Sequence, residues 1–109
     1  MTQYEVWWAD LPGSAGRRPV LLLSRPSAYA YLDRVCVCEI TTTARGIPQE
    51  VRLGAREGLK RASVASLDNI QMVPKRRLSG RIGRLSPGQA LEVKRAVGYA
   101  FDWIELKGN

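Results

Sequence analysis

Short segments of β-type sequence fill the first two-thirds of the chain, and a single helix pattern follows them. The segments are rich in apolar, β-branched or aromatic residues and are separated by turn signals, which is typical of strands. We therefore expect strands at residues 4–11, 18–24, 34–41, 50–53, 63–67 and 70–73. Residues 26–33 indicate no regular element.

The last third of the chain changes to a helical period. Ser86-Pro87-Gly88-Gln89 is typical of a helix start, because Ser86 and Gln89 can cap each other's backbone N–H groups and proline suits the first helical position. Apolar residues then recur at spacings near three and four, at Ala90, Val93, Val97, Ala100, Phe101 and Ile104. This spacing predicts an amphipathic helix whose apolar stripe packs against the sheet.

The order of these elements predicts the fold class. A chain of 109 residues suits one domain, so we expect a single domain over residues 1–109. Many short strands and one terminal helix predict a mainly β fold, in which the helix covers a small, strongly bent sheet or open barrel. No apolar run approaches the roughly 18 residues of a membrane helix, and no signal-peptide pattern opens the chain. We expect a cytoplasmic protein with no membrane partner.

Positive charge is the strongest signal in the composition. The chain has 17 Lys and Arg against 10 Asp and Glu, which gives a formal net charge of +7. This balance favours a polyanionic partner, such as RNA, DNA or an acidic protein tail. Five of the cations lie within residues 75–84, and the sequence leaves open whether they form a solvated surface or contact nucleic acid.

The chain has no histidine, which disfavours most hydrolase mechanisms and a zinc site. The spacing of Cys36 and Cys38 places both on one face of a strand, where we expect reduced, apolar core residues rather than metal ligands. The loop at residues 13–16 leads into a strand, whereas a phosphate-binding loop should lead into a helix. We therefore expect no metal and no other cofactor.

RNA cleavage is compatible with these absences, because the substrate supplies its own nucleophile, the ribose 2′-OH. Arginine suits the stabilisation of charge on phosphate oxygens, and a threonine hydroxyl can add a hydrogen bond. Arg17 and Arg18 open the second expected strand, and residues 41–43, all threonine, follow the third. If these strands are antiparallel neighbours, both groups lie at one edge of the sheet. The residues alone indicate a basic β-rich domain suited to RNA binding.

The order of several short motifs resembles the MazF/PemK-type toxins of bacterial toxin–antitoxin systems. The resemblance covers nearly the whole chain. It rests on Glu5-Val6-Trp7-Trp8-Ala9-Asp10-Leu11, Gly13-Ser14, Arg18-Pro19-Val20-Leu21, Glu39-Ile40-Thr41-Thr42, Gly58-Leu59, Ser63-Val64, Leu67-Asp68-Asn69-Ile70, Lys75-Arg76-Arg77-Leu78 and Gly83-Arg84-Leu85-Ser86.

The resemblance implies an SH3-like barrel of the CcdB/PemK type with a C-terminal helix, in a homodimer. It also implies a metal-independent endoribonuclease that cuts single-stranded RNA at a short sequence and leaves 2′,3′-cyclic phosphate and 5′-hydroxyl ends. The implied partner is a MazE-like antitoxin whose acidic, partly disordered tail occupies the RNA groove. The net charge of +7 suits such a tail.

The resemblance also implies roles for individual residues. The family's catalytic arginine before Pro-Val falls on Arg18, and its threonine after the core strand falls on Thr41. An aspartate with an acid/base role in PemK-like members falls on Asp68. The neighbouring polar and basic residues are the candidates for RNA binding: Ser14, Arg17, Thr42, Thr43, Arg76 and Arg77.

The loop before Arg18 departs from the family pattern. The family commonly has Gly-Ser-Glu-Gln or Gly-His-Glu-Gln there, whereas this chain has Gly13-Ser14-Ala15-Gly16, which is shorter by about two residues and lacks the acidic residue. Two alternatives to a ribonuclease therefore remain: a topoisomerase poison of the related CcdB type and a non-catalytic RNA-binding SH3-like module.

Overall fold

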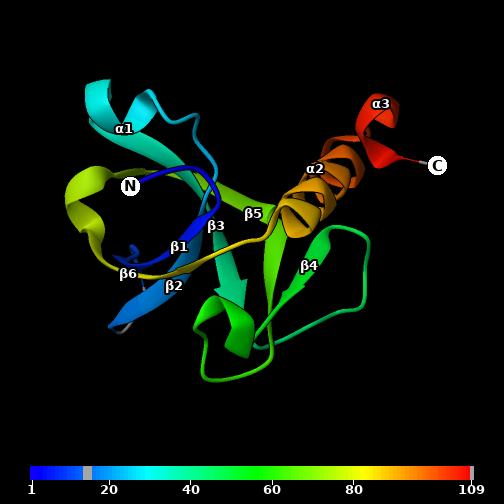
Figure 1. Ribbon diagram of the computed structural model, residues 1–109, viewed down its shortest axis with the longest axis horizontal. Coiled ribbons are helices and arrows are strands. Elements are labelled where there is room, and N and C mark those ends of the chain that lie inside the picture. The colour runs from blue at the N-terminus through cyan, green and yellow to red at the C-terminus, as the bar shows by residue number, and fades with distance from the viewer. Residues whose placement is uncertain (14–15, 109) are drawn as a thin grey trace.

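A single antiparallel sheet of six strands, in the order β4-β5-β3-β2-β1-β6, forms the body of the protein (Figure 1). The computed structural model describes residues 1–13 and 16–108. The strands are β1 (Glu5–Asp10), β2 (Arg17–Leu22), β3 (Arg34–Thr41), β4 (Glu50–Leu53), β5 (Ser63–Pro74) and β6 (Leu78–Arg84). The helices are α1 (Ala28–Tyr31), α2 (Pro87–Phe101) and α3 (Ile104–Lys107), and two 3₁₀ turns are η1 (Ala55–Glu57) and η2 (Lys75–Arg77).

The first four expected strands are confirmed, and β3 and β4 have the expected bounds. The two strands expected at residues 63–67 and 70–73 are one strand, β5, with a bulge where we expected a turn. Cys38 pairs with Ile70 and Ile40 pairs with Ala65, so Glu39 alone opposes residues 66–69. The bulge bends β5 without ending it, because both of its halves pair with the same strand, β3.

Strand β6 was not expected from the sequence. Its residues, LSGRIGR, include two glycines and two arginines. Glycine has a low β-propensity, and the arginines interrupt the apolar run that would indicate a buried strand. It forms because it pairs with β1 at an edge of the sheet. Gly83 is needed there, since a Cβ atom at this position would collide with the carbonyl oxygen of Glu57.

The expected start of α2 is confirmed. The Gln89 N–H donates to Ser86 Oγ at 3.2 Å, and the Ser86 N–H donates to Gln89 Oε1 at 2.8 Å. The prediction of the apolar stripe is wrong at the C-terminal end of the helix. Helix α2 ends at Phe101, which is 52% exposed, and Ile104 lies beyond the helix and is 76% exposed. The chain turns at Asp102, whose left-handed backbone (φ 56°) directs the following residues away from the stripe.

Residues 26–33, for which no element was expected, contain the single helical turn α1. Helix α2 lies beside β4 and β5, whereas α1 lies at the other side of the sheet (Figure 1). Along the described residues, no helix is long and apolar enough to cross a membrane.

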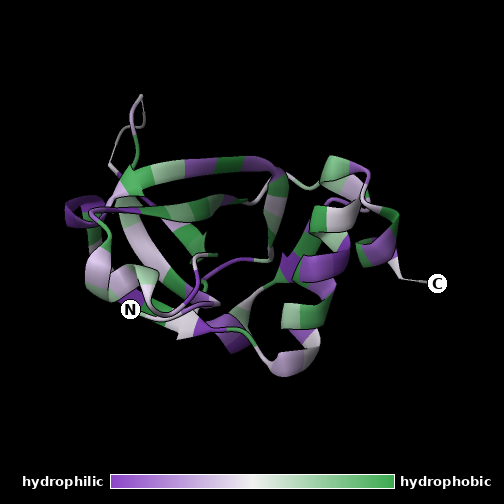
Figure 2. Ribbon diagram, turned by 90° about the horizontal axis from the view of Figure 1, so that it is seen from above, coloured by the Kyte–Doolittle hydropathy of each residue, from purple (hydrophilic) through white to green (hydrophobic). Residues whose placement is uncertain are grey.

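Each face of the sheet carries a hydrophobic core, because β2 alternates its side chains between the two faces. Leu21 belongs to a larger core that includes α2, and Val20 and Leu22 belong to a second core on the opposite face. Strand β2 therefore has buried hydrophobic residues on both faces. Figure 2 shows hydrophobic and hydrophilic segments along the ribbon of the whole chain. We call the second face, which carries Val20 and Leu22, the β2-even face.

The expected burial of the two cysteines is confirmed for Cys38, which is fully buried in the larger core. Cys36 is only half-buried, so the expectation that both are core residues is wrong for this one. Both thiols are free, and burial raises the pKa of each above its usual value.

Candidate active site at one end of β2 and β3

Strands β2 and β3 are antiparallel neighbours, as expected. Val20 pairs with Glu39, Leu21 with Cys38 and Leu22 with Val37. The same register, continued by two residues toward the start of β2, brings Arg18 opposite Thr41. The arginine at the beginning of one strand and the threonine at the end of the next therefore lie at the same end of the sheet, and in the continued register their Cβ atoms are about 5 Å apart.

Arg17 and Arg18 are directed to opposite faces of the sheet. Arg18 shares the β2-even face with Val20 and Leu22, because side chains alternate along a strand. Arg17 lies on the other face, where its guanidinium carbon stacks 4.5 Å from the centre of the Trp8 ring. Both arginines are exposed. The structure thus brings one arginine of the pair, not both, to the face that carries Thr41.

The Thr41 side chain is half-buried at the end of β3. Its hydroxyl oxygen accepts a hydrogen bond of 3.2 Å from the backbone N–H of Thr43, which fixes the side chain and leaves the hydroxyl proton free to donate. Thr42 and Thr43 follow the strand and are exposed. The three threonines therefore differ: the fold holds Thr41 in place, and the other two lie in solvent.

Asp68 lies in the bulge of β5, and its side chain is exposed. The bulge opposes Glu39 on β3, so Asp68 is about two strand spacings, or roughly 10 Å, from β2. The structure therefore places Asp68 beside the end of β3, across that strand from Arg18.

The basic turn η2 lies on the other side of Arg18. Leu78, the first residue of β6, is opposite Ala9 on β1, and Ala9 is opposite Arg18 on β2. Arg77 precedes Leu78 and so lies about two strand spacings from Arg18. Arg76 is exposed and Arg77 half-buried. The remaining RNA-binding candidate, Ser14, lies outside the described residues.

Glu39 is a residue of this site that sequence reasoning missed. It pairs with Val20, so its side chain lies on the β2-even face with Arg18 and Thr41. It is half-buried, and its Oε2 accepts a hydrogen bond of 3.4 Å from Gln71 Nε2 on β5. One sequence feature could have identified it. Glu39 is two residues after Val37, a buried core residue, so both side chains lie on the same face of β3, and a charged residue there must lie at the edge of the core.

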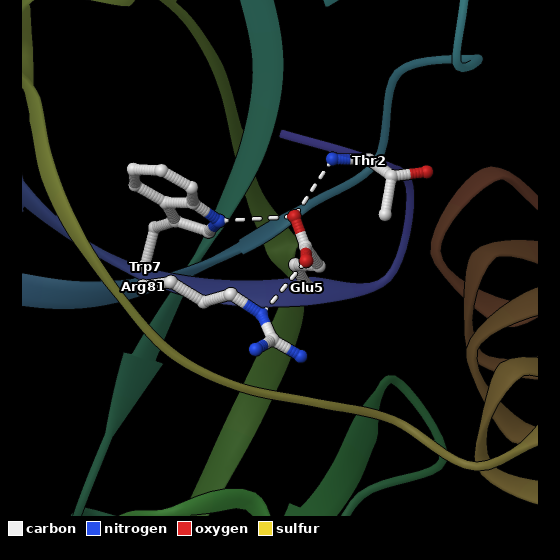
Figure 3. Close-up of polar contacts among 4 residues, drawn as sticks. All are labelled: Thr2, Glu5, Trp7 and Arg81. Carbon is white, nitrogen blue, oxygen red and sulfur yellow. Dashed lines mark hydrogen bonds and ion pairs between the residues drawn. The ribbon is translucent and has the colours of Figure 1, made fainter.

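Glu5 is a second carboxylate that sequence reasoning missed, and it is almost fully buried, with 8% of its surface exposed. Figure 3 shows its carboxylate held from three directions. The Thr2 N–H donates to Oε1 at 2.7 Å, Trp7 Nε1 donates to Oε1 at 3.2 Å, and Arg81 Nε lies 2.7 Å from Oε2. These contacts fasten the N-terminal residues and β6 to β1.

Opposing effects determine the pKa of Glu5. Burial alone would raise the pKa of this carboxyl, because burial disfavours the charged form. The hydrogen bonds from Thr2 and Trp7 and the positive charges of Arg81 and the N-terminus together outweigh burial and hold the pKa below its usual value. Glu5 is therefore a carboxylate that is fixed through both of its oxygens.

Within residues 1–13 and 16–108, no three His, Cys, Asp or Glu side chains are grouped so that they could hold a metal ion. The chemistry available to the site from this part of the chain is that of one arginine, threonine hydroxyls and carboxylates. These groups can bind phosphate, donate hydrogen bonds and transfer protons.

Comparison with known proteins places the chain in a family. A sequence model of the "PemK-like, MazF-like toxin of type II toxin-antitoxin system" matches residues 2–101. The chain belongs to this family. The expected resemblance to MazF/PemK-type toxins is thus confirmed, as is the expected mainly β sheet with a C-terminal helix.

Individual MazF relatives agree with this assignment. The chain is 43% identical to "Endoribonuclease MazF3" of Mycobacterium tuberculosis over 89 residues, which are 80% of this chain and 86% of the relative. The solved structure "Mycobacterium tuberculosis toxin MazF-mt6" superposes with a TM-score of 0.84 at 40% identity, covering 90% of this chain and 96% of the other. A second structure, "Endoribonuclease in complex with its cognate antitoxin from Mycobacterial species", has a TM-score of 0.83 at 26% identity and covers 94% and 96%.

Proposed function

We propose that this MazF-family toxin is a metal-independent endoribonuclease that cleaves single-stranded RNA in the cytoplasm by attack of the 2′-OH on the adjacent phosphate. The observation that carries the proposal is the register of β2 and β3, which places Arg18, two residues before Val20, at the same end of the sheet as Thr41, two residues after Glu39. The relatives named endoribonuclease support the reaction class. The products are a 2′,3′-cyclic phosphate and a 5′-hydroxyl end.

In this proposal Arg18 binds the scissile phosphate. Its guanidinium is exposed, always charged, and shaped to donate two hydrogen bonds to phosphate oxygens. Negative charge on those oxygens grows as the 2′ oxygen approaches phosphorus, so the contact strengthens in the transition state. Thr41 donates its hydroxyl proton to one of the same oxygens from the neighbouring strand. The Thr43 N–H keeps the Thr41 oxygen in place for this contact.

Residues around this pair bind the rest of the RNA. Asp68 takes part in proton transfer from the far side of β3, and the candidates for contact with the RNA chain are Ser14, Arg17, Thr42, Thr43, Arg76 and Arg77. Arg76, Arg17 and Arg18 are exposed and lie at one end of β1, β2 and β6, so they offer successive positive charges to a phosphate backbone. Arg17, because it faces away from Thr41, contributes to binding rather than to the chemical step.

The proposed protein partners are a second copy of this chain and an antitoxin with an acidic tail. Relatives solved as "MazE-MazF" from Deinococcus radiodurans and in complex with a "cognate antitoxin" support the second. The net charge of +7 favours an acidic segment and accelerates its encounter with the toxin. Light scattering of the purified chain tests the homodimer, and titration with the acidic product of the adjacent gene tests the antitoxin.

The test of the proposed function is cleavage of a long RNA in the presence of a chelator. We expect discrete fragments that end in 2′,3′-cyclic phosphate, and loss of these fragments with Arg18→Ala. The matched control is Arg95→Ala, which removes the same charge from an exposed position on α2. Intact RNA with the wild type would overturn the proposal and favour a topoisomerase poison or a non-catalytic RNA-binding module.

A further inference from the structure

The proposed reaction needs a group that removes the proton of the 2′-OH. Arg18 cannot do so, because a guanidinium group stays protonated in proteins, and the Thr41 hydroxyl serves as a donor. A carboxylate is the remaining type of base in this part of the site. Resting on the function proposed above, we infer that Glu39 is the general base that accepts this proton.

The position of Glu39 supports this role. Glu39 is two residues before Thr41 on β3, so both side chains lie on the same face of the sheet. Arg18 is opposite Thr41 in the continued register, which makes Glu39 a diagonal neighbour of Arg18 with Cβ atoms about 7–8 Å apart. A phosphate held between Arg18 and Thr41 would have its adjoining ribose within reach of a glutamate side chain at that distance.

The surroundings of Glu39 leave its carboxylate able to accept a proton. The side chain is half-buried and lies on the same face of the sheet as Val20 and Val37, both of which have no exposed surface. Its hydrogen-bond partner is the neutral amide of Gln71, at 3.4 Å, and no described lysine or arginine forms an ion pair with it. The Gln71 amide orients Oε2 and leaves Oε1 as an acceptor.

The step balances as a transesterification. Glu39 takes the 2′ proton as the 2′ oxygen forms its bond to phosphorus, and the bond from phosphorus to the 5′ oxygen breaks. The leaving 5′ oxygen takes a proton from water, and the hydroxide that remains is neutralised by the proton that Glu39 later releases. Glu39 returns its proton to solvent after the products leave. No oxidant, metal or second substrate is needed.

Replacement of Glu39 by glutamine tests the inference. Glu39→Gln keeps the size of the side chain and its contact with Gln71 but cannot accept the proton. After the cut site of the wild type has been mapped on a short oligonucleotide, we expect kcat of Glu39→Gln to fall by about 10²- to 10⁴-fold. Its affinity for the same oligonucleotide with a 2′-deoxy nucleotide at the cut should stay within about twofold. Glu92→Gln, an exposed position on α2, is the control for the loss of one negative charge.

The dependence of the rate on pH separates a base from a structural residue. The wild-type kcat should rise tenfold per pH unit below the pKa of the base, and this limb should vanish in Glu39→Gln. A substitution can also disturb folding, so Glu39→Ala is assayed with added formate, a small carboxylate that can replace the missing base. Formate should raise the cleavage rate of Glu39→Ala several-fold. It should not raise the rate of Arg18→Ala.

The outcomes distinguish the inference from the function on which it rests. Cleavage by wild type and Glu39→Gln at equal kcat with the same pH profile would overturn the role of Glu39 and leave the endoribonuclease proposal standing. Loss of kcat with no change of the pH limb and no rescue by formate would also overturn it. Absence of cleavage by the wild type would overturn both.

Discussion

Glu5 and Glu39 are carboxylates on the same face of one sheet, but their surroundings assign them opposite roles. Glu5 is 8% exposed and is held by Thr2, Trp7 and Arg81. Glu39 is half-buried and accepts one long hydrogen bond from an uncharged amide. The residue type and the face of the sheet are alike in the two cases. The number and charge of the donors decide whether the carboxylate fastens the fold or is free to react.

A large effect is expected at Arg18, and it tests whether the chemical step belongs to the face of the sheet that Arg18 shares with Glu39. Arg18→Ala should lower kcat by about 10²–10³, because it removes a charged donor from the developing phosphorane. Arg17→Ala, one residue away but on the other face with Trp8, should mainly raise KM. Steady-state cleavage of the mapped oligonucleotide measures both parameters. Equal losses of kcat in the two variants would contradict the division between the faces.

Removal of the Glu5 charge should affect stability instead of the chemical step. Glu5→Gln should lower the free energy of unfolding by about 1–3 kcal/mol, since it weakens hydrogen bonds and an ion pair around a buried carboxylate. Glu39→Gln should change it by less than about 0.5 kcal/mol. Urea denaturation measures both values. A more destabilised Glu39→Gln would reverse the roles that we assign.

The same contrast predicts a pH effect on stability. The pKa of Glu5 is lowered in the folded protein, so its stabilisation is complete above the unfolded pKa of about 4.3 and is lost as the pH falls through the folded pKa. The stability difference between wild type and Glu5→Gln should therefore be constant near pH 7 and shrink below about pH 4. Denaturation at several pH values checks this trend. A difference that grew on acidification would show the opposite sign of the pKa shift.

A smaller effect is expected when one donor to Glu5 is removed. Trp7→Phe keeps an aromatic ring, smaller than the indole, against the second core but loses the Nε1–H bond of 3.2 Å. We expect a loss of about 0.5–1.5 kcal/mol in the free energy of unfolding, and a smaller further loss when Trp7→Phe is added to Glu5→Ala. A fully additive double variant would show that the indole does not act through Glu5.

The smallest expected effect concerns the donor to Glu39. Gln71→Ala removes the bond that orients the Glu39 carboxylate, and we expect kcat to fall by about threefold to tenfold. The effect should disappear in the Glu39→Gln background, because Gln71 then has no base to position. An undiminished effect in that background would assign Gln71 a role independent of Glu39.

Much of the fold could be predicted from local sequence patterns. The strands β3 and β4 and the Ser86 cap were predicted at the observed residues, because hydrophobic alternation and capping depend on neighbours within a few residues. Strand β6 could not be predicted, since its glycines and arginines form a strand only by pairing with β1. The stripe on α2 was extended too far, because Phe101 is exposed at the end of the helix and the turn at Asp102 directs Ile104 away from the stripe.

For the candidate site, the sequence predicted which strand ends lie together but not which face each side chain takes. The placement of Arg18 near Thr41 followed from antiparallel pairing of neighbouring strands, and the observed register agrees with it. The roles of Arg18, Thr41 and Asp68 remain predictions. The sequence treated Arg17 and Arg18 as a pair, and it overlooked Glu39 because a single acidic residue in an apolar strand has no motif of its own.

The sequence by itself determined the family, most strands, the cap of α2 and the positively charged residues that suit RNA. These features are local, or they follow from residue order along the chain. Only the tertiary structure decided which charged groups meet. Glu39 faces Gln71 from 32 residues away, and Glu5 meets Arg81 on β6, which is distant in sequence but pairs with β1. Their different surroundings therefore arise from strand register rather than from neighbouring residues in the sequence. Register is set by burying both faces of the sheet at once, which no short stretch of sequence specifies.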